Sequence, residues 1–258
     1  RPGFSFGIFS AKMNKDFKRG LISNFVGWAI LAGVSIAMHL WRLAIVSAAI
    51  NYAVFLIHAL PQNSEKFFDA TGSLTYLALI SCAFLLSSGH APRQIVNPIM
   101  VVVWCIRLGT FLLSRILRDG KDSRFDELKK NWLRFLGVWT IQSIWCFLVA
   151  SPALVVVTSK SCETSAGALD FVGWGIWLGG FLFEVVADKQ KDIFRKDPAN
   201  KGKFITSGLW AYSRHPNYFG EIMMWVAMCI SGSSCFHGWE FLAFLSPLTT
   251  WLLLLKVS

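Results

Sequence analysis

The sequence is poor in charge and lacks the short motifs of soluble nucleotide-binding and metal-binding proteins. Charged residues make up 16% of its 258 positions and hydrophobic residues 54%, a balance too apolar for a soluble domain of this size. Neither a GxGxxG string nor a P-loop occurs, which excludes a Rossmann or Walker nucleotide site. The six cysteines form no CxxC pair and no Cys/His metal spacing. We therefore expect no metal site and interpret the cysteines as packing residues.

Long apolar runs take up most of the chain. Six of them approach the roughly 20 residues that cross a bilayer, and two are shorter. They lie at 21–40, 43–60, 71–89, 95–117, 136–157 and 169–187, with the shorter runs at 219–234 and 241–255. This pattern predicts an all-α polytopic membrane bundle of seven or eight transmembrane helices. We expect residues 1–20 to form a basic N-terminal segment and residues 21–258 a single membrane domain.

The net charge of +10 is distributed between the apolar runs. Basic residues cluster before the first run, after the fourth and after the sixth, so an even number of crossings separates each cluster from the next. All three clusters then face one side of the membrane, which is the positive-inside pattern. Because the chain has no continuous basic tract, we expect no nucleic-acid partner.

The stretch GLWAYSRHPNYFGE, residues 208–221, is the most informative part of the chain. Pro216 suits the first position of a helix, where its missing N–H costs nothing. Backbone N–H groups at that helix start, together with Arg214, predict an anion site. Glu221 shares a helix face with Asn217, and an ionisable residue in such an apolar helix is usually functional. The alternative interpretation is an interfacial helix start with an Arg/Glu pair and a tyrosine belt.

A second polar pattern lies where the sixth run ends. Glu184, Asp188, Lys191 and Arg195 recur at helical spacing and form one stripe. Two carboxylates four residues apart repel each other, so stability alone does not explain them. Ribose hydroxyls or an amino group would use the carboxylates as acceptors, and the cations suit phosphate. A solvated face beside the membrane explains the same stripe equally well.

The third pattern follows the fourth run. Arg107 lies within that run, where an unpaired charge is costly, so it must face the bundle interior or a wet cavity. Thr110, Ser114 and Arg118 continue on roughly the same stripe and predict a path inward from the basic surface. Lys121 suits cofactor phosphate, and an ordinary positive-inside loop explains it as well.

In these three stretches the sequence resembles the steroid 5-alpha-reductase-like family of membrane proteins. The resemblance is strongest over residues 95–258, and YSRHPNYFGE is its specific part. Related strings occur in sterol reductases and in isoprenylcysteine carboxyl methyltransferases. The resemblance implies NADPH in a cavity open to the cytosolic side, and hydride transfer to the C=C of a lipid or sterol-like enone. The chain departs from the steroid reductases in lacking their early-helix glutamate, and Arg107 stands near the position of their tyrosine.

The resemblance also implies roles for individual residues. Those expected to bind the cofactor are Lys121, Glu184, Asp188, Arg195, Lys203, Arg214, Asn217 and Glu221. Those expected near the reacting atoms, where an acid must protonate a substrate carbon, are Arg107, Tyr212 and His215.

Two other functions stay open. The shared Arg-His-Pro string fits an S-adenosylmethionine-dependent methyltransferase, and the missing early glutamate fits a non-catalytic accessory subunit of a larger membrane assembly such as a respiratory complex. The expected partners are a lipid or sterol-like substrate, membrane lipids and, for the accessory subunit, other subunits. The expected locations are the endoplasmic reticulum or the bacterial inner membrane, with the mitochondrial inner membrane as the alternative.

Overall fold

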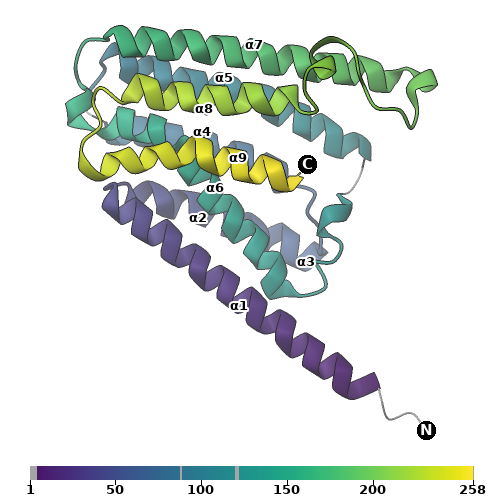
Figure 1. The fold of residues 1–258 in the computed structure, drawn as a ribbon. Helices are drawn as coiled ribbons and strands as arrows, with labels where there is room; N and C mark the ends of the chain where they lie inside the picture. Colours follow the sequence, from purple (N-terminus) through teal and green to yellow (C-terminus); the bar gives the residue numbers. More distant parts are fainter. Residues whose placement is uncertain (1–4, 88, 120–121, 258) are drawn as a thin grey trace. The chain divides into compact units, whose positions relative to one another are not determined.

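The computed structural model describes residues 5–87, 89–119 and 122–257, and across them the regular structure is helical with no strand (Figure 1). The α-helices are α1 (Ser5–Ala37), α2 (Trp41–Val54), α3 (Leu60–Gln62), α4 (Phe68–Leu86), α5 (Pro92–Asp119), α6 (Trp132–Thr158), α7 (Ala168–Lys196), α8 (Pro216–Gly232) and α9 (Leu245–Val257). A π-helical turn, η1 (Phe55–Ala59), joins α2 to α3. The short 3₁₀ turns are η2 (Ser123–Phe125), η3 (Lys160–Cys162), η4 (Pro198–Asn200), η5 (Gly208–Ala211) and η6 (Gly238–Phe244). The predicted all-α class is confirmed.

Seven segments of the described chain are long and apolar enough to cross a membrane. They are Lys15–Ala37, Trp41–Gln62, Phe68–Leu86, Pro92–Leu112, Trp132–Thr158, Ala168–Lys196 and Gly238–Leu255. Helix α8 is also apolar but has only 17 residues. The prediction of seven or eight transmembrane helices is therefore confirmed.

The chain divides into two compact units. Unit 1 comprises Arg1–Leu86 and Ile99–Ala150, and unit 2 comprises Ser87–Pro98 and Ser151–Ser258. The expectation of a basic segment at 1–20 followed by one membrane domain stays a prediction.

Unit 1 combines an aromatic core with polar contacts between its helices. Phe55, Phe135 and Trp139 pack together with both phenylalanine rings against the indole. The Thr140 hydroxyl on α6 donates to Asn24 Oδ1 on α1 over 2.5 Å. Inside an apolar bundle such hydrogen bonds hold helices together because lipid offers polar groups no partners.

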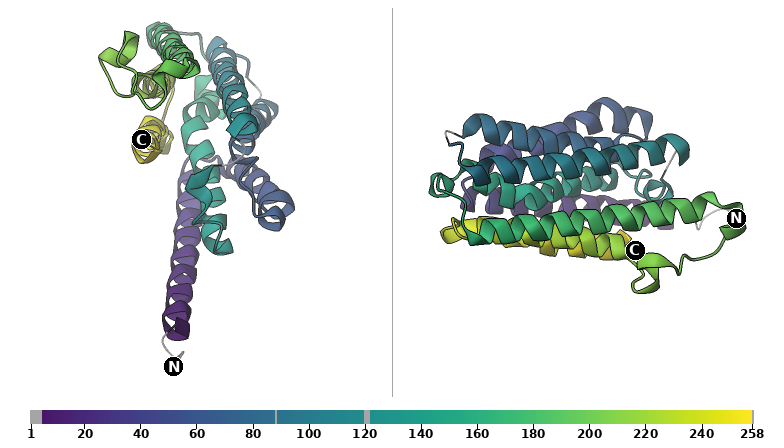
Figure 2. Two further views of the ribbon diagram at one scale, coloured as in Figure 1. Left: turned by 90° about the vertical axis from the view of Figure 1, so that its right-hand side faces the viewer. Right: turned by 90° about the horizontal axis from the view of Figure 1, so that it is seen from above.

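In unit 2, α7 and α8 run antiparallel and side by side, as both Figure 1 and Figure 2 show. Glycines permit the close approach of the two backbones. A methyl group added at Gly220 of α8 would lie 2.7 Å from the Gly180 carbonyl oxygen of α7. A methyl group added at Gly173 would lie 2.7 Å from the Ala227 carbonyl oxygen. Small residues at a helix interface are the usual means of tight packing in membranes.

One end of unit 2 is fixed by a disulfide and a buried ion pair. Cys162 and Cys235 are bonded across 73 residues, joining the α6–α7 connection to the segment after α8. The interpretation of all six cysteines as packing residues is wrong for these two, because their partnership arises only when the chain folds. Nearby in the unit, Arg93 Nη2 donates to Asp170 Oδ2 over 2.7 Å, and both side chains are buried.

Candidate functional site at the α7–α8 end

The polar end of α7 lies beside the start of α8 in unit 2. Pro216 is the first residue of α8, as the sequence predicts. One residue later, Asn217 Nδ2 donates a hydrogen bond to Asp188 Oδ1 on α7 over 3.1 Å. The other amide atom, Asn217 Oδ1, is buried and has no hydrogen-bond partner among the described residues. A buried acceptor of this kind is costly unless a ligand or water satisfies it.

Glu184 lies one turn deeper on α7 and is 2% exposed. It packs against the start of α8, where a methyl group added at Gly220 would lie 3.0 Å from Glu184 Cβ. Farther along the predicted stripe, Asp188 is half-buried and Arg195 is exposed. The stripe therefore runs from the helix interface out to solvent, as its helical spacing predicts. Glu221, one turn after Asn217 on α8, is half-buried.

The connection between α7 and α8 is held onto α7 by Lys191 of the predicted stripe and by two residues that the sequence did not point to, Gln190 and Trp210. Trp210 is buried, and its Nε1 donates to the Ala187 carbonyl over 3.0 Å. The Lys191 ammonium lies 4.7 Å from the centre of the same indole ring, a cation–π contact. Gln190 Oε1 accepts from the Leu209 backbone N–H over 2.9 Å. The signal in the sequence for Trp210 was a tryptophan in the connection between two apolar runs.

His215 is the N-cap residue of α8. Its ring stacks on Tyr218 with centres 4.7 Å apart, and its backbone N–H donates to the Ser213 hydroxyl. Burial, together with the positive charges of Lys191 and Arg214, lowers the pKa of His215 below its ordinary value of 6.5. The imidazole is therefore mainly neutral at pH 7.

Three other predicted residues of this unit lie on the exposed connection. Tyr212 is 92% exposed, and the side chains of Lys203 and Arg214 are also exposed. The two cations lie within the same segment as Tyr212 and His215, so the connection carries a concentrated positive charge. Such charge on exposed, flexible side chains suits phosphate recognition.

Arg107 belongs to unit 1, where it lies half-buried on α5. The Thr110 hydroxyl donates to the Arg107 carbonyl over 2.9 Å, and the Ser114 hydroxyl donates to the Phe111 carbonyl over 2.7 Å. Both hydroxyls are thus engaged by their own helix. The predicted inward path along this stripe stays a prediction. Lys121 and the Arg118 side chain lie outside the described residues.

Fold and site together define a multi-pass helical membrane protein with a polar cluster at one end of α7 and α8. The chain belongs to the family described as Protein of unknown function (DUF1295), whose model matches residues 54–258. This match and the relatives below confirm the predicted resemblance to the steroid 5-alpha-reductase-like branch.

Curated relatives include both reductases and a methyltransferase. The chain is similar to Delta(14)-sterol reductase ERG24B of Gibberella zeae, with 23% identity over 61% of this chain and 34% of the relative. It is similar to 3-oxo-5-alpha-steroid 4-dehydrogenase 1 of Macaca fascicularis, with 35% identity over 24% of each chain. It is also similar to the probable O-methyltransferase ustE of Ustilaginoidea virens, with 32% identity over 30% of this chain and 27% of the relative. The matches thus span about a quarter to a third of these relatives' lengths. No solved structure matches significantly.

Proposed function

We propose that this protein is an NADPH-dependent membrane reductase that transfers hydride to the C=C of a lipid or sterol-like enone. The proposal rests on the hydrogen bond between Asp188 and Asn217. This bond uses the amide nitrogen of Asn217 and leaves the buried Oδ1 as an acceptor at the N-terminal end of α8. The reductase names of several relatives support the reaction class.

The residues present fit the chemical groups of NADPH. The Asp188 carboxylate and Asn217 Oδ1 are acceptors suited to ribose hydroxyls or to the carboxamide nitrogen. Arg195, Lys203 and Arg214 provide exposed cations for the phosphates. When bound, NADPH supplies the hydride.

The chain's own residues would orient the reaction and manage the proton. Hydride addition to an enone requires an acid that protonates the neighbouring carbon. Tyr212 and His215 are the predicted groups in unit 2, and Arg107 is the predicted group in unit 1. Because His215 is mainly neutral at pH 7, it would act there as a hydrogen-bonding group rather than as a cation facing phosphate. Glu184, buried beside Gly220, would order the α7–α8 interface next to the cofactor.

The proposed surroundings follow from the apolar spans. Membrane lipids contact the protein, and the substrate enters from the lipid phase. The endoplasmic reticulum, the bacterial inner membrane and the mitochondrial inner membrane stay the predicted locations.

A methyltransferase is the second candidate function. It is favoured by the similarity to a probable O-methyltransferase over 76 residues. This function would require S-adenosylmethionine in place of NADPH. Tight binding of S-adenosylhomocysteine without binding of NADPH would favour the second function over the first.

The test is the ligand content of gently purified protein, measured by mass spectrometry. We expect NADPH in the wild type and its loss in Asn217→Ala and Asp188→Ala. Asp192→Ala is a matched control, since Asp192 is a carboxylate on the same helix that pairs with Lys196 over 2.6 Å. NADPH oxidation with a panel of lipid enones then tests turnover. Purified, folded protein that neither binds nor oxidises NADPH would exclude the proposal and favour the methyltransferase or the accessory subunit.

A further inference from the structure

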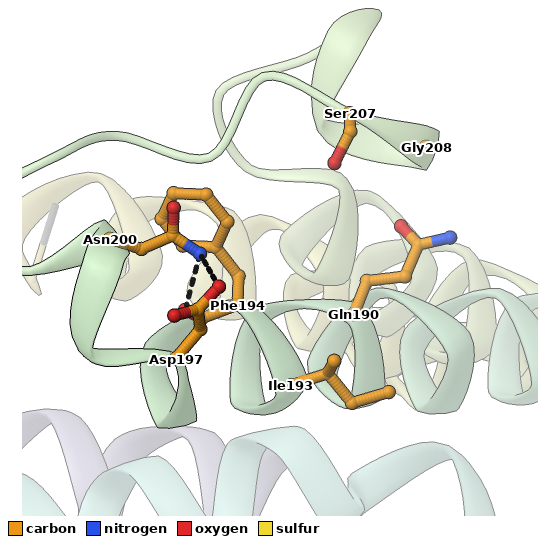
Figure 3. Close-up of a pocket in the computed structure, with 7 residues that line it drawn as sticks. All are labelled: Gln190, Ile193, Phe194, Asp197, Asn200, Ser207 and Gly208. Atoms are coloured by element: carbon orange, nitrogen blue, oxygen red, sulfur yellow. Dashed lines mark hydrogen bonds between the residues drawn. The ribbon is translucent and has the colours of Figure 1, made fainter.

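An open pocket lies beside the C-terminal end of α7, built from residues outside the predicted site. It has a volume of about 360 Å³ and is lined by Gln190, Ile193, Phe194, Asp197, Asn200, Ser207 and Gly208 (Figure 3). Small-molecule pockets span roughly 300 to 1,000 Å³. The pocket therefore suits one ring system with its sugar and is too small for a whole dinucleotide.

Contacts within the wall fix which polar atoms a ligand would meet. Gln190 Oε1 accepts from Leu209 N–H, so its Nε2 donors are presented to a ligand. Asn200 Nδ2 donates to the Phe194 carbonyl over 3.1 Å, so its Oδ1 is the acceptor presented. The Ser207 hydroxyl lies across the pocket from Ile193 (Figure 3). Gly208 has φ +60°, and a side chain there would collide with the Gln190 amide.

The pocket lining contains a negative charge, and positive charges lie beside it in the sequence. Asp197 is the acidic residue of the wall, and its Oδ1 accepts from Ala199 N–H over 2.9 Å. Its negative charge opposes a phosphate inside the pocket. Exposed Arg195, Lys201 and Lys203 lie on either side of Asp197 along the chain and would attract a phosphate placed outside the pocket.

An aromatic wall, a neutral donor, a neutral acceptor and a hydroxyl are the groups that suit a heteroaromatic base. The Phe194 ring offers a stacking surface, and the amide groups match the mixed donor and acceptor edge of a purine. An alkyl chain would leave these polar groups without partners, which is unfavourable.

We propose that this pocket binds the adenine nucleoside end of a nucleotide, with the phosphate directed to the basic rim. Given the proposed function, the nucleotide is NADPH and the pocket is its adenine subsite. The Asp188–Asn217 pair then belongs to a different part of the cofactor site, because neither residue lines this pocket.

The test measures binding of two halves of the cofactor, adenosine 2′,5′-bisphosphate and reduced nicotinamide mononucleotide, to detergent-purified protein by calorimetry. We expect Phe194→Ala to weaken the adenosine half about five- to hundredfold, the range typical of one lost base stack. Ser207→Ala should weaken the same half by a smaller factor. Neither variant should change binding of the nicotinamide half. Phe204→Ala is the matched control, since Phe204 is 92% exposed and does not line the pocket.

The outcomes separate this inference from the proposed function. If NADPH binds but neither pocket variant changes the affinity of the adenosine half, the pocket assignment is overturned and the reductase proposal stands. If the adenosine half binds in a Phe194-dependent way but NADPH is never oxidised, the pocket assignment stands and the reductase proposal fails. Phe194-dependent binding of inositol bisphosphate in preference to the adenosine half would overturn the assignment in favour of a lipid headgroup. Thermal unfolding of each variant checks that it is folded.

Discussion

Asp188 on α7 accepts a hydrogen bond from Asn217 on α8, with 3.1 Å between Oδ1 and Nδ2. The two residues are 29 positions apart and meet because α7 and α8 pack in antiparallel fashion. Each holds the other's side chain in place. A cofactor that uses one of them therefore depends on both.

The first prediction is that this dependence is measurable as coupling. Asp188→Ala and Asn217→Ala should each weaken NADPH binding about tenfold. The double variant should lose less affinity than the product of the two single losses. The measurement is calorimetric titration of the four proteins. Losses that multiply independently would contradict a shared role of the pair.

The second prediction concerns the glycine contact between α7 and α8. Gly220→Ala should destabilise the protein by about 1–3 kcal/mol, because the new methyl group meets the Gly180 carbonyl and the Glu184 backbone. Gly179→Ala is the matched control on α7, since a methyl group there has no atom within 4 Å and should change stability by less than about 1 kcal/mol. Thermal unfolding in detergent compares the two. Equal melting temperatures would contradict a tight backbone contact at Gly220.

The third prediction concerns acid stability in unit 1. Burial alone would raise the pKa of Glu65, but hydrogen bonds from Lys129 Nζ (2.6 Å) and from Asp122 N–H (2.8 Å) outweigh it and hold the pKa below its ordinary value of 4.5. A lowered carboxylate pKa stabilises the folded state above pH 4.5, and this contribution is lost as the pH falls through the folded-state pKa. The free energy of unfolding should therefore depend on pH less steeply in Glu65→Gln than in the wild type.

The partner of Glu65 gives a complementary measurement. Lys129→Met should cost about 1.5–3 kcal/mol at pH 7, the usual loss of a hydrogen bond between charged groups. Lys130→Met is the control, because Lys130 and its partner Glu127 are both mainly exposed and such pairs contribute little. Similar destabilisation by both variants would argue against a special role of the Glu65 contact.

The fourth prediction concerns the Cys162–Cys235 disulfide. Cys162→Ser should lower stability by about 2–4 kcal/mol, because a closed loop restricts the unfolded chain. Reductant should shift the melting temperature of the wild type but not of this variant. Cys82→Ser is the control, since Cys82 is a free thiol. A gel run without reductant reports the bond directly, and unchanged mobility after reduction of the unfolded chain would contradict its presence.

Features set by local chemistry were predictable from the sequence. Pro216 marks the start of α8 because a residue without N–H is suited to the first helical turn. The transmembrane runs were predictable because lipid demands about 20 apolar residues in succession. The polar stripe on α7 was predictable from helical periodicity, and it does run from buried Glu184 to exposed Arg195.

Features that depend on which distant segments meet were not predictable. The sequence indicated Asp188 and Asn217 as site residues, but nothing in it indicated that their side chains form a hydrogen bond with each other. Gln190 and Trp210 were missed because their roles arise only when the connection folds back onto α7. The Arg93–Asp170 ion pair was missed for the same reason, since its members lie 77 residues apart.

The disulfide also constrains how the chain matures. It lies at the end of α7 and α8 opposite the basic 197–215 connection, and by the positive-inside rule we expect that connection on the side of the membrane that retains basic loops. We then expect the two cysteines on the opposite side of the membrane, and a lasting disulfide there requires an oxidising compartment. Cys235 arrives there only after α8 has been inserted, so the bond forms late. The bond can thus close only after α7 and α8 have inserted as an antiparallel hairpin.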